Sequence, residues 1–155
     1  MTLAAYQQYA GLMPAHWDLY RQNIVSTLAV AQPDVHLVAE QQDRIVGSVL
    51  LYPAGSVVAR PGGGSITLAW PEVRLLAVAP AARGRGVGAA LMQACILRAR
   101  HARAAALTLH TIEIMEAAMR LYERMSFVRA PELDFQPTPG VVIKGYRLGL
   151  ENTGC

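Results

Sequence analysis

The sequence predicts a single α/β (α+β) domain that spans residues 1–155. Apolar residues recur at helical spacing in some segments and at strand spacing in others, and the two kinds of segment are mixed along the chain. In addition, residues 72–110 have the pattern of strand, glycine-rich loop, helix and strand. This pattern predicts two parallel strands joined by a right-handed crossover. A chain of 155 residues suffices for one hydrophobic core.

The first part of the chain, up to residue 32, is predicted to be helical. Four apolar residues recur there at spacings of three and four: Trp17, Tyr20, Ile24 and Leu28. Pro14 suits the first turn of the second of two helices. Residues 35–41 and 44–52 have strand character around a tight polar turn, which predicts an antiparallel hairpin.

Residues 53–71 contain Gly62, Gly63 and Gly64, and we expect a mobile loop there with a short strand near residues 66–69. Residues 72–78 are too apolar for a half-solvated strand, which favours a central position in a sheet.

The helix that follows the glycine-rich loop has a buried stripe, and a strand at residues 106–110 comes after it. The stripe consists of Val87, Leu91, Cys95 and Ala99. The spacing of residues in the segment 115–125 predicts a further helix. Four residues lie on one face of it: Met115, Ala118, Met119 and Tyr122. Residues 127–133 and 141–150 alternate like two closing strands.

Composition narrows the class of protein. No segment reaches the ~18 apolar residues of a spanning helix, and the N-terminus lacks a basic signal region. We therefore expect a soluble cytoplasmic protein with no membrane partner. The net charge of +3 suits a small anionic ligand better than a nucleic acid. Cys95 and Cys155 are too few for a disulfide framework and lack the spacing of metal ligands, so no metal is expected.

The most informative segment runs from Glu72 to Met92 and predicts an anion site. The early N–H groups of a helix have no intrahelical partner, and the helix dipole adds roughly half a positive charge there. Three glycines allow the backbone to approach a phosphate, and two arginines can donate charge-assisted hydrogen bonds. These residues are Gly84, Gly86 and Gly88, with Arg83 and Arg85.

Three kinds of phosphate-binding loop could account for these glycines. A P-loop is excluded because no Gly-Lys-Ser/Thr follows. Residues 84–89 match the dinucleotide pattern G-x-G-x-x-A, but they lie six residues beyond the strand, and no acid follows about 20 residues later. Residues 83–89, Arg-Gly-Arg-Gly-Val-Gly-Ala, resemble the R/Q-x-x-G-x-G/A loop of the GNAT N-acetyltransferase superfamily, which holds the pyrophosphate of acetyl-CoA.

Two further segments carry the resemblance. Residues 75–80, Leu-Leu-Ala-Val-Ala-Pro, are similar to the fourth strand and turn of the family, and residues 118–127 are similar to its A-x-x-L-Y-E-x-x-G-F motif. The resemblance implies a central mixed, mostly antiparallel sheet of six to seven strands with helices on both faces. The parallel unit would consist of the family's fourth strand, third helix and fifth strand.

The resemblance also implies the residues of the site. Backbone groups of the fourth strand would hold the pantetheine arm and stabilise the oxyanion, and the loop would hold the pyrophosphate. The matching cofactor-binding positions are Leu76, Ala77, Val78, Arg83, Gly84, Arg85, Gly86, Val87, Gly88 and Ala89. Tyr122 matches the general acid. A phenol with an ordinary pKa of about 10 is still protonated when a thiolate with a pKa of about 8.5 leaves.

The general base stays open between Glu72, His110 and water. Relatives carry a base at positions that match Glu72 or His110. A carboxylate with an ordinary pKa of about 4.3 is a poor direct acceptor, whereas an imidazole near pKa 6.5 suits neutral pH.

Two positions depart from the family pattern. Met115 replaces an asparagine that helps to hold the cofactor in many relatives, and this removes a hydrogen bond worth about 1 kcal/mol. Ser126 replaces a glycine after the helix, which costs stability if that position needs a positive φ.

The resemblance implies an acetyl-CoA-dependent N-acetyltransferase with acetyl-CoA as cosubstrate. The acceptor would be a primary amine, either a small molecule, an amino-acid derivative or a protein N-terminus, and it would attack directly in a ternary complex. The alternative is a non-catalytic acyl-CoA-binding or regulatory domain. Pairing of exposed strand edges between subunits, frequent in this family, would be compatible with a homodimer.

Overall fold

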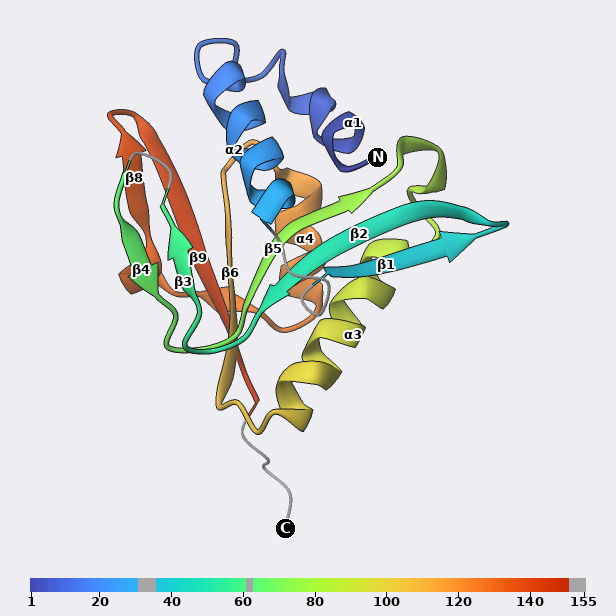
Figure 1. The fold of residues 1–155 in the computed structure, drawn as a ribbon, viewed down its shortest axis with the longest axis vertical. Helices are drawn as coiled ribbons and strands as arrows, with labels where there is room; N and C mark the ends of the chain where they lie inside the picture. The colour runs from blue at the N-terminus through green and yellow to red at the C-terminus, as the bar shows by residue number, and fades with distance from the viewer. Residues whose placement is uncertain (31–35, 61–62, 151–155) are drawn as a thin grey trace. The chain divides into compact units, whose positions relative to one another are not determined.

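The computed structural model describes residues 1–30, 36–60 and 63–150 (Figure 1). Within it, the chain forms two compact units. The first comprises Met1–Leu51 and Leu75–Gln93, and the second comprises Tyr52–Arg74 and Ala94–Cys155. Strand β5 and helix α3 each contribute one part to each unit, so we describe the two units separately.

The helices and strands follow the predicted order closely. The helical elements are α1 (Thr2–Tyr6), η1 (Gln7–Tyr9), α2 (Trp17–Val30), η3 (Pro80–Ala82), α3 (Val87–His101), α4 (Glu116–Arg124) and η4 (Pro131–Leu133). The strands are β1 (His36–Gln41), β2 (Arg44–Tyr52), β3 (Val57–Ala59), β4 (Ser65–Thr67), β5 (Glu72–Val78), β6 (Ala106–Thr111), β7 (Val128–Arg129), β8 (Phe135–Thr138) and β9 (Val141–Gly149).

Hydrogen bonds connect seven strands in the order β1-β2-β5-β6-β9-β7, with β8 paired to β9. Strands β5 and β6 are parallel, whereas the β1–β2, β6–β9, β7–β9 and β8–β9 pairs are antiparallel. This confirms the predicted mixed, mostly antiparallel sheet with one parallel strand–helix–strand unit.

In the first unit, β2 carries helices on opposite faces. The Thr2 hydroxyl in α1 lies 3.2 Å from the Ser48 hydroxyl. A Cβ placed on the adjacent Gly47 would meet Val87 and Leu91 of α3 at 2.7 and 2.9 Å. Because neighbouring strand residues point to opposite faces, α1 and the start of α3 cover the two faces of this strand. Gly47 is needed for the close approach of α3.

The N-terminal helices differ in one detail from the sequence prediction. Helix α2 begins at Trp17, and Pro14 lies in the turn before it. The buried Ile24 anchors α2 with no exposed surface. Val35, predicted as the first residue of a strand, lies outside the described residues, and β1 begins at His36.

In the second unit, β6 is paired on both sides. Glu72 and Val73 of β5 lie opposite Thr108 and Leu109 in the parallel ladder, and Ala106 to Thr111 pair with β9. Strand β6 is buried along nearly its whole length, as a central strand should be.

Two segments of the second unit contain structure that the sequence did not predict. Residues 53–71, expected as a loop with one short strand near residues 66–69, hold the β3–β4 hairpin, in which Val58 pairs with Ile66. Strand β4 agrees with the expected short strand, and β3 was not predicted. Gly63 and Gly64 have positive φ in the turn of this hairpin, while Gly62 lies outside the described residues. The strand expected at residues 127–133 is only two residues long, because Pro131, which has no N–H to donate, begins a 3-10 turn instead.

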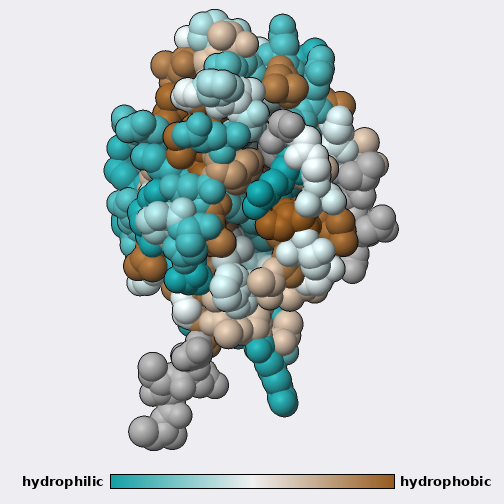
Figure 2. Space-filling view, turned by 90° about the vertical axis from the view of Figure 1, so that its left-hand side faces the viewer, coloured by the Kyte–Doolittle hydropathy of each residue, from teal (hydrophilic) through white to brown (hydrophobic). Residues whose placement is uncertain are grey.

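On the face drawn in Figure 2, hydrophilic and hydrophobic residues are interspersed. None of the helices in the described ranges combines the length and the apolar character needed to cross a bilayer.

Candidate active site

The predicted phosphate loop lies in the first unit, between η3 and α3. Gly84 and Gly86 adopt φ values of +76° and +79°, a region that residues with a side chain rarely occupy. No atom lies within 4 Å of the place where a Cβ would stand on either glycine. The loop therefore presents bare backbone at the start of α3, which fits the pyrophosphate of acetyl-CoA.

The two arginines of this loop differ in their contacts. The guanidinium of Arg83 donates to the Ala5 carbonyl and to the Gln8 side chain at 2.9 Å each, and to the Val78 carbonyl at 3.3 Å. Arg85 is exposed, and it has no ion pair within residues 1–30, 36–60 and 63–150. Arg83 thus ties the loop to α1 and η1, whereas the side chain of Arg85 is exposed.

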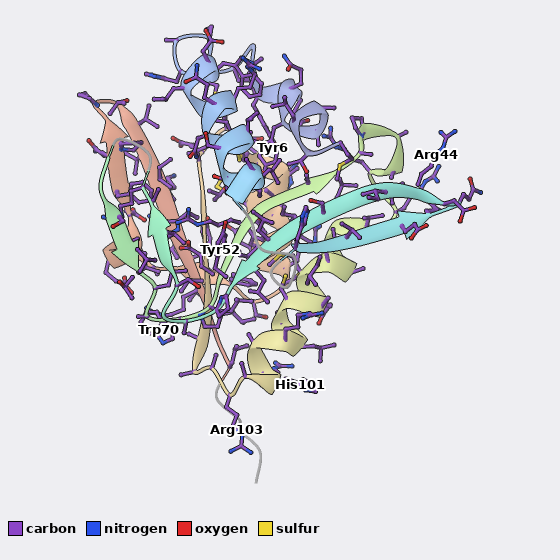
Figure 3. All side chains as sticks on the ribbon, in the orientation of Figure 1. Tyr6, Arg44, Tyr52, Trp70, His101 and Arg103 are labelled. Atoms are coloured by element: carbon purple, nitrogen blue, oxygen red, sulfur yellow. The ribbon has the colours of Figure 1, made fainter. Side chains whose placement is uncertain are left out.

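In the second half of β5, two residues have their backbone N–H and C=O groups on the side away from β2. The Ala79 N–H donates to the Val46 carbonyl of β2 at 2.8 Å, so alternation places the N–H and C=O of Ala77 toward β2. The N–H and C=O groups of Leu76 and Val78 point away from β2. Their carbonyls accept from the Tyr6 hydroxyl at 2.8 Å and from Arg83, and Figure 3 labels Tyr6 on α1.

Strand β5 also contains a strained residue. Leu75 has a φ of +52°, although it is neither glycine nor part of a turn. Such a conformation costs about 1–2 kcal/mol for an L-residue with a side chain. It breaks the regular alternation of the strand just before Leu76. No signal in the sequence pointed to it, since leucine is an ordinary strand residue.

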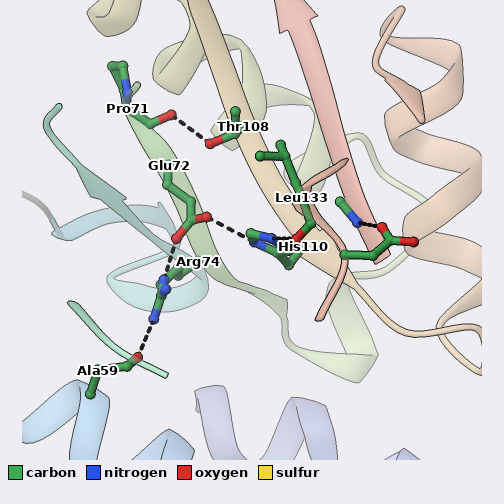
Figure 4. A network of polar contacts seen from close by, with 9 residues as sticks. Ala59, Pro71, Glu72, Arg74, Thr108, His110 and Leu133 are labelled. Atoms are coloured by element: carbon green, nitrogen blue, oxygen red, sulfur yellow. Dashed lines mark hydrogen bonds and ion pairs between the residues drawn. The ribbon is translucent and has the colours of Figure 1, made fainter. Parts of the chain in front are cut away.

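In the second unit, Glu72 is the centre of a polar network (Figure 4). Its side chain is only 2% exposed, and it lies between two basic groups. Its Oε2 accepts from Arg74 Nε at 2.6 Å, and its Oε1 lies 2.9 Å from His110 Nδ1. Burial alone would raise the pKa of the Glu72 carboxyl, but the hydrogen bond from His110 and the charge of Arg74 outweigh it and lower the pKa. The carboxyl is therefore ionised at neutral pH.

The two alternative bases thus contact each other, and His110 has acceptors at both ring nitrogens. Its Nδ1 faces the Glu72 carboxylate, and its Nε2 lies 3.0 Å from the Leu133 carbonyl. A carbonyl and an ionised carboxylate only accept hydrogen bonds. The Glu72 carboxylate and the Leu133 carbonyl therefore hold the His110 ring at both of its nitrogens.

The neighbouring Asp134 forms an ion pair and accepts a backbone hydrogen bond. These two contacts, which we call the Asp134 clamp, hold the Leu133 carbonyl in place. The guanidinium of Arg129 binds both oxygens of Asp134 at 2.8 Å, and Asp134 accepts from the Gly145 N–H at 2.7 Å. The hydrogen bond from Arg129 lowers the pKa of Asp134 to about 2, against the effect of burial. A Cβ on Gly145 would overlap Leu133, so only glycine allows η4 to lie this close to β9.

Tyr122 lies on α4 in an aromatic cluster of the second unit. Its side chain is 6% exposed, and its ring centre lies 6.0 Å from that of Phe127 and 6.5 Å from that of Tyr146. The predicted inner face of this helix agrees with the structure, since Met115 is also buried. The motif residue Ser126 has a φ of +73°, so the family's glycine position does need a positive φ here.

Comparisons with known proteins decide the family. The model of the Acetyltransferase (GNAT) family matches residues 3–127. The chain belongs to the GNAT acetyltransferase family. This acetyltransferase therefore takes its acetyl group from acetyl-CoA, as the family does. A search of curated proteins found no match.

Solved structures show the same fold as this acetyltransferase. PH1933 from Pyrococcus horikoshii is 19% identical with a TM-score of 0.66, covering 97% of this chain and 88% of that one. The ribosomal-protein-S18-alanine N-acetyltransferase of Escherichia coli is 20% identical, with a TM-score of 0.60 and coverage of 83% and 78%. The protein yncA of Salmonella typhimurium, solved with acetyl-CoA, is 16% identical, with a TM-score of 0.55 and coverage of 89% and 76%.

The predicted site residues of the acetyltransferase fall into two sets. The cofactor-binding candidates, residues 76–78 and 83–89, lie in the first unit, whereas Glu72, His110 and Tyr122 lie in the second. The described part of the chain holds no group of three or more His, Cys, Asp or Glu residues that could bind a metal ion. Sequence reasoning missed Arg74, although an arginine two residues after a buried strand glutamate shares its face of the strand and was a usable signal.

Proposed function

We propose that the chain is an N-acetyltransferase whose acceptor is a primary amine, and that the amine attacks the acetyl group directly in a ternary complex. The observation that carries this proposal is the loop at the start of α3, where Gly84 and Gly86 adopt the left-handed conformations that open the backbone to a phosphate. An amine acceptor is also consistent with the name of the Escherichia coli neighbour, which specifies an alanine of a ribosomal protein.

The cofactor-binding residues divide the task along the first unit. The N–H groups of residues 84–89 would bind the pyrophosphate with help from Arg85. The edge of β5 formed by Leu76 and Val78 would hold the pantetheine arm and stabilise the negative charge on the carbonyl oxygen. Ala77 would contribute by keeping this edge paired to β2. Arg83 would position the loop from behind, through its bonds to Ala5 and Gln8.

The cosubstrate supplies an activated thioester, and Tyr122 would supply the proton that its thiol product needs. As the amine nitrogen bonds to the acetyl carbon, the carbon–sulfur bond breaks, and the Tyr122 hydroxyl proton passes to the sulfur. A phenol has a proton to give in this step, because with an ordinary pKa of about 10 it is still protonated when a thiolate with a pKa of about 8.5 leaves.

We assign removal of the amine proton to water. Glu72 is buried with both oxygens hydrogen-bonded, and both ring nitrogens of His110 already face an acceptor, one the Glu72 carboxylate and the other the Leu133 carbonyl. If water is the base, kcat/KM should keep rising with pH toward the pKa of the amine, and Glu72→Gln and His110→Ala should leave that acidic limb in place. An acidic limb that disappears in His110→Ala would instead assign the base to His110.

The proposed reaction is tested by CoA release from acetyl-CoA over a panel of amines. We expect Tyr122→Phe to lower kcat by about 100-fold or more, the typical loss for a general acid. Tyr146→Phe is the matched control, because Tyr146 is a buried tyrosine of the same aromatic cluster. It should change kcat by less than about threefold.

Two results would contradict the proposal. Equal activity of Tyr122→Phe and wild type would remove the acid role of Tyr122. Acetyl-CoA binding without CoA release on any amine would favour a non-catalytic acyl-CoA-binding domain.

A further inference from the structure

Three basic side chains are linked to Glu72, two directly and one through an aromatic ring. Arg74 and His110 contact the carboxylate, and Arg60 contacts the Phe135 ring, which in turn meets His110. Glu72 is 2% exposed, whereas the side chains of Arg74 and His110 are 23% and 21% exposed, and Arg60 is exposed. The carboxylate is therefore buried, and the accessible charged groups are the two guanidinium groups. An anionic ligand would be attracted to this cluster, which we call the arginine–histidine cluster.

Arg60 is joined to the cluster from two sides. Its guanidinium lies over the Phe135 ring at 5.0 Å from the ring centre, and the edge of that ring meets His110 at 5.3 Å between centres. Through the backbone, Arg60 follows Ala59, whose carbonyl accepts from Arg74 Nη1 at 3.4 Å (Figure 4). The end of β3 thus brings Arg60 to the same group of side chains as Arg74 and His110.

Arg60 differs from the other arginines of this sheet region. Arg129 binds Asp134 at 2.8 Å, and Arg147 binds Glu132 at 2.7 Å. Within residues 1–30, 36–60 and 63–150, Arg60 has an aromatic ring as partner and no carboxylate. A contact with a ring uses none of the N–H groups for a carboxylate, so the guanidinium can still bind an added carboxylate in bidentate fashion.

We propose that Arg60, supported by the positive charge of Arg74, binds a carboxylate of the acceptor. The acceptor class is then a small amine that also carries a carboxylate, such as an α-amino acid. This inference rests on the proposed function and narrows its acceptor. A polycationic acceptor is disfavoured, because its charges would meet the exposed side of Arg60 and Arg74.

The test compares α-amino acids with their carboxamides, which keep the amine and lose the carboxylate charge. We expect kcat/KM for CoA release to be at least about tenfold higher for the amino acids, the usual effect of one charge-assisted hydrogen bond. Arg60→Gln should remove this preference by raising KM for the amino acids, with little change in kcat and no change for the carboxamides.

Arg44→Gln is the control variant, because Arg44 lies exposed at the tip of the β1–β2 hairpin and loses the same charge (Figure 3). It should keep the full preference. A preference for carboxamides, or an equal loss for both members of each pair in Arg60→Gln, would overturn the inference.

A second measurement separates this inference from the reaction itself. Equilibrium dialysis in the presence of CoA would compare the binding of the same amino acids and carboxamides to wild type and Arg60→Gln. If no amine supports CoA release but amino acids bind in an Arg60-dependent manner, the proposed function fails and the carboxylate site stands. If amines support CoA release but wild type and Arg60→Gln discriminate equally between amino acids and carboxamides, the function stands and the carboxylate site fails.

Discussion

The two units of this chain build their functional groups in opposite ways. The first unit makes its proposed phosphate loop from consecutive residues, 83–89, whose glycines fix the backbone shape locally. The second unit makes its polar network from residues far apart in the sequence, since His110 bonds to Leu133 and Arg74 to Ala59. A local site depends on backbone conformation, whereas an assembled site depends on the strands and turns that carry it.

This comparison can be tested most directly in the loop. Gly86→Ala should raise KM for acetyl-CoA about tenfold with kcat little changed, because a side chain at φ +79° costs about 1–2 kcal/mol and reshapes the backbone. The measurement is initial-rate kinetics with varied acetyl-CoA.

Gly140→Ala is the matched control for the loop. Gly140 has a φ of +84° with open space around it, as Gly86 has, but it lies in the β8–β9 turn. The two variants should lose similar stability, and only Gly86→Ala should change KM. Equal changes of KM would show that strain anywhere in the chain, and not the loop itself, determines cofactor binding.

In the second unit, the stability of the fold should instead depend on pH through the Asp134–Arg129 ion pair. The pKa of Asp134 is lowered to about 2 by Arg129, so its carboxylate stabilises the folded state above pH 4. This stabilisation is lost as the pH falls from about 4 to about 2, where the folded carboxyl takes up its proton. Because the pair is partly exposed and water screens it, we expect about 1 kcal/mol.

Urea unfolding of wild type and Asp134→Asn between pH 7 and pH 2 measures this effect. The difference in the free energy of unfolding should be constant above pH 5 and should vanish near pH 2. Glu132→Gln, which affects a more exposed carboxylate paired with Arg147, should give a smaller difference. A difference for Asp134→Asn that persists at pH 2 would contradict the assigned role of its charge.

The smallest expected effect concerns a left-handed residue of the second unit. The loop of the first unit uses glycine at such positions, but Ser126 has a φ of +73°. Ser126→Gly should relieve this conformation and raise the free energy of unfolding by about 0.5 kcal/mol, part of the gain being offset by the larger entropy of the unfolded chain.

Ser65→Gly, within β4, is the control, because that serine does not have a positive φ and should lose stability on replacement by glycine. Thermal unfolding of both variants would measure the two changes. A loss of stability in both variants would mean that the Ser126 side chain stabilises the fold by more than its left-handed conformation costs.

Much of the fold was predictable because its signals are local. The apolar run of β5, the buried stripe of α3 and the polar turn between β1 and β2 each depend on a few neighbouring residues, and their bounds agree closely with the structure. Strand β3 and its pairing with β4 were missed because both strands are three residues long and lie between glycines and prolines. Such short strands give no usable periodicity.

The contacts between the candidate site residues could not be predicted from the sequence. Glu72 and His110 were separate alternatives in the sequence, because nothing in their spacing shows that parallel β5 and β6 bring them within 2.9 Å. The role of Leu133 could not be predicted, because its backbone carbonyl is the group that contacts His110. The φ of Leu75 likewise depends on packing, which a leucine does not signal.

The long sequence separations in the Glu72 network also govern how the chain is made. A ribosome adds Glu72 and Arg74 to the chain before it adds His110 and Leu133. Until then the carboxylate lacks the groups that compensate its burial, so it must stay in water. The proposed phosphate loop has its residues together as soon as α3 emerges. During synthesis, this loop is therefore complete in sequence before the polar network of the second unit can close.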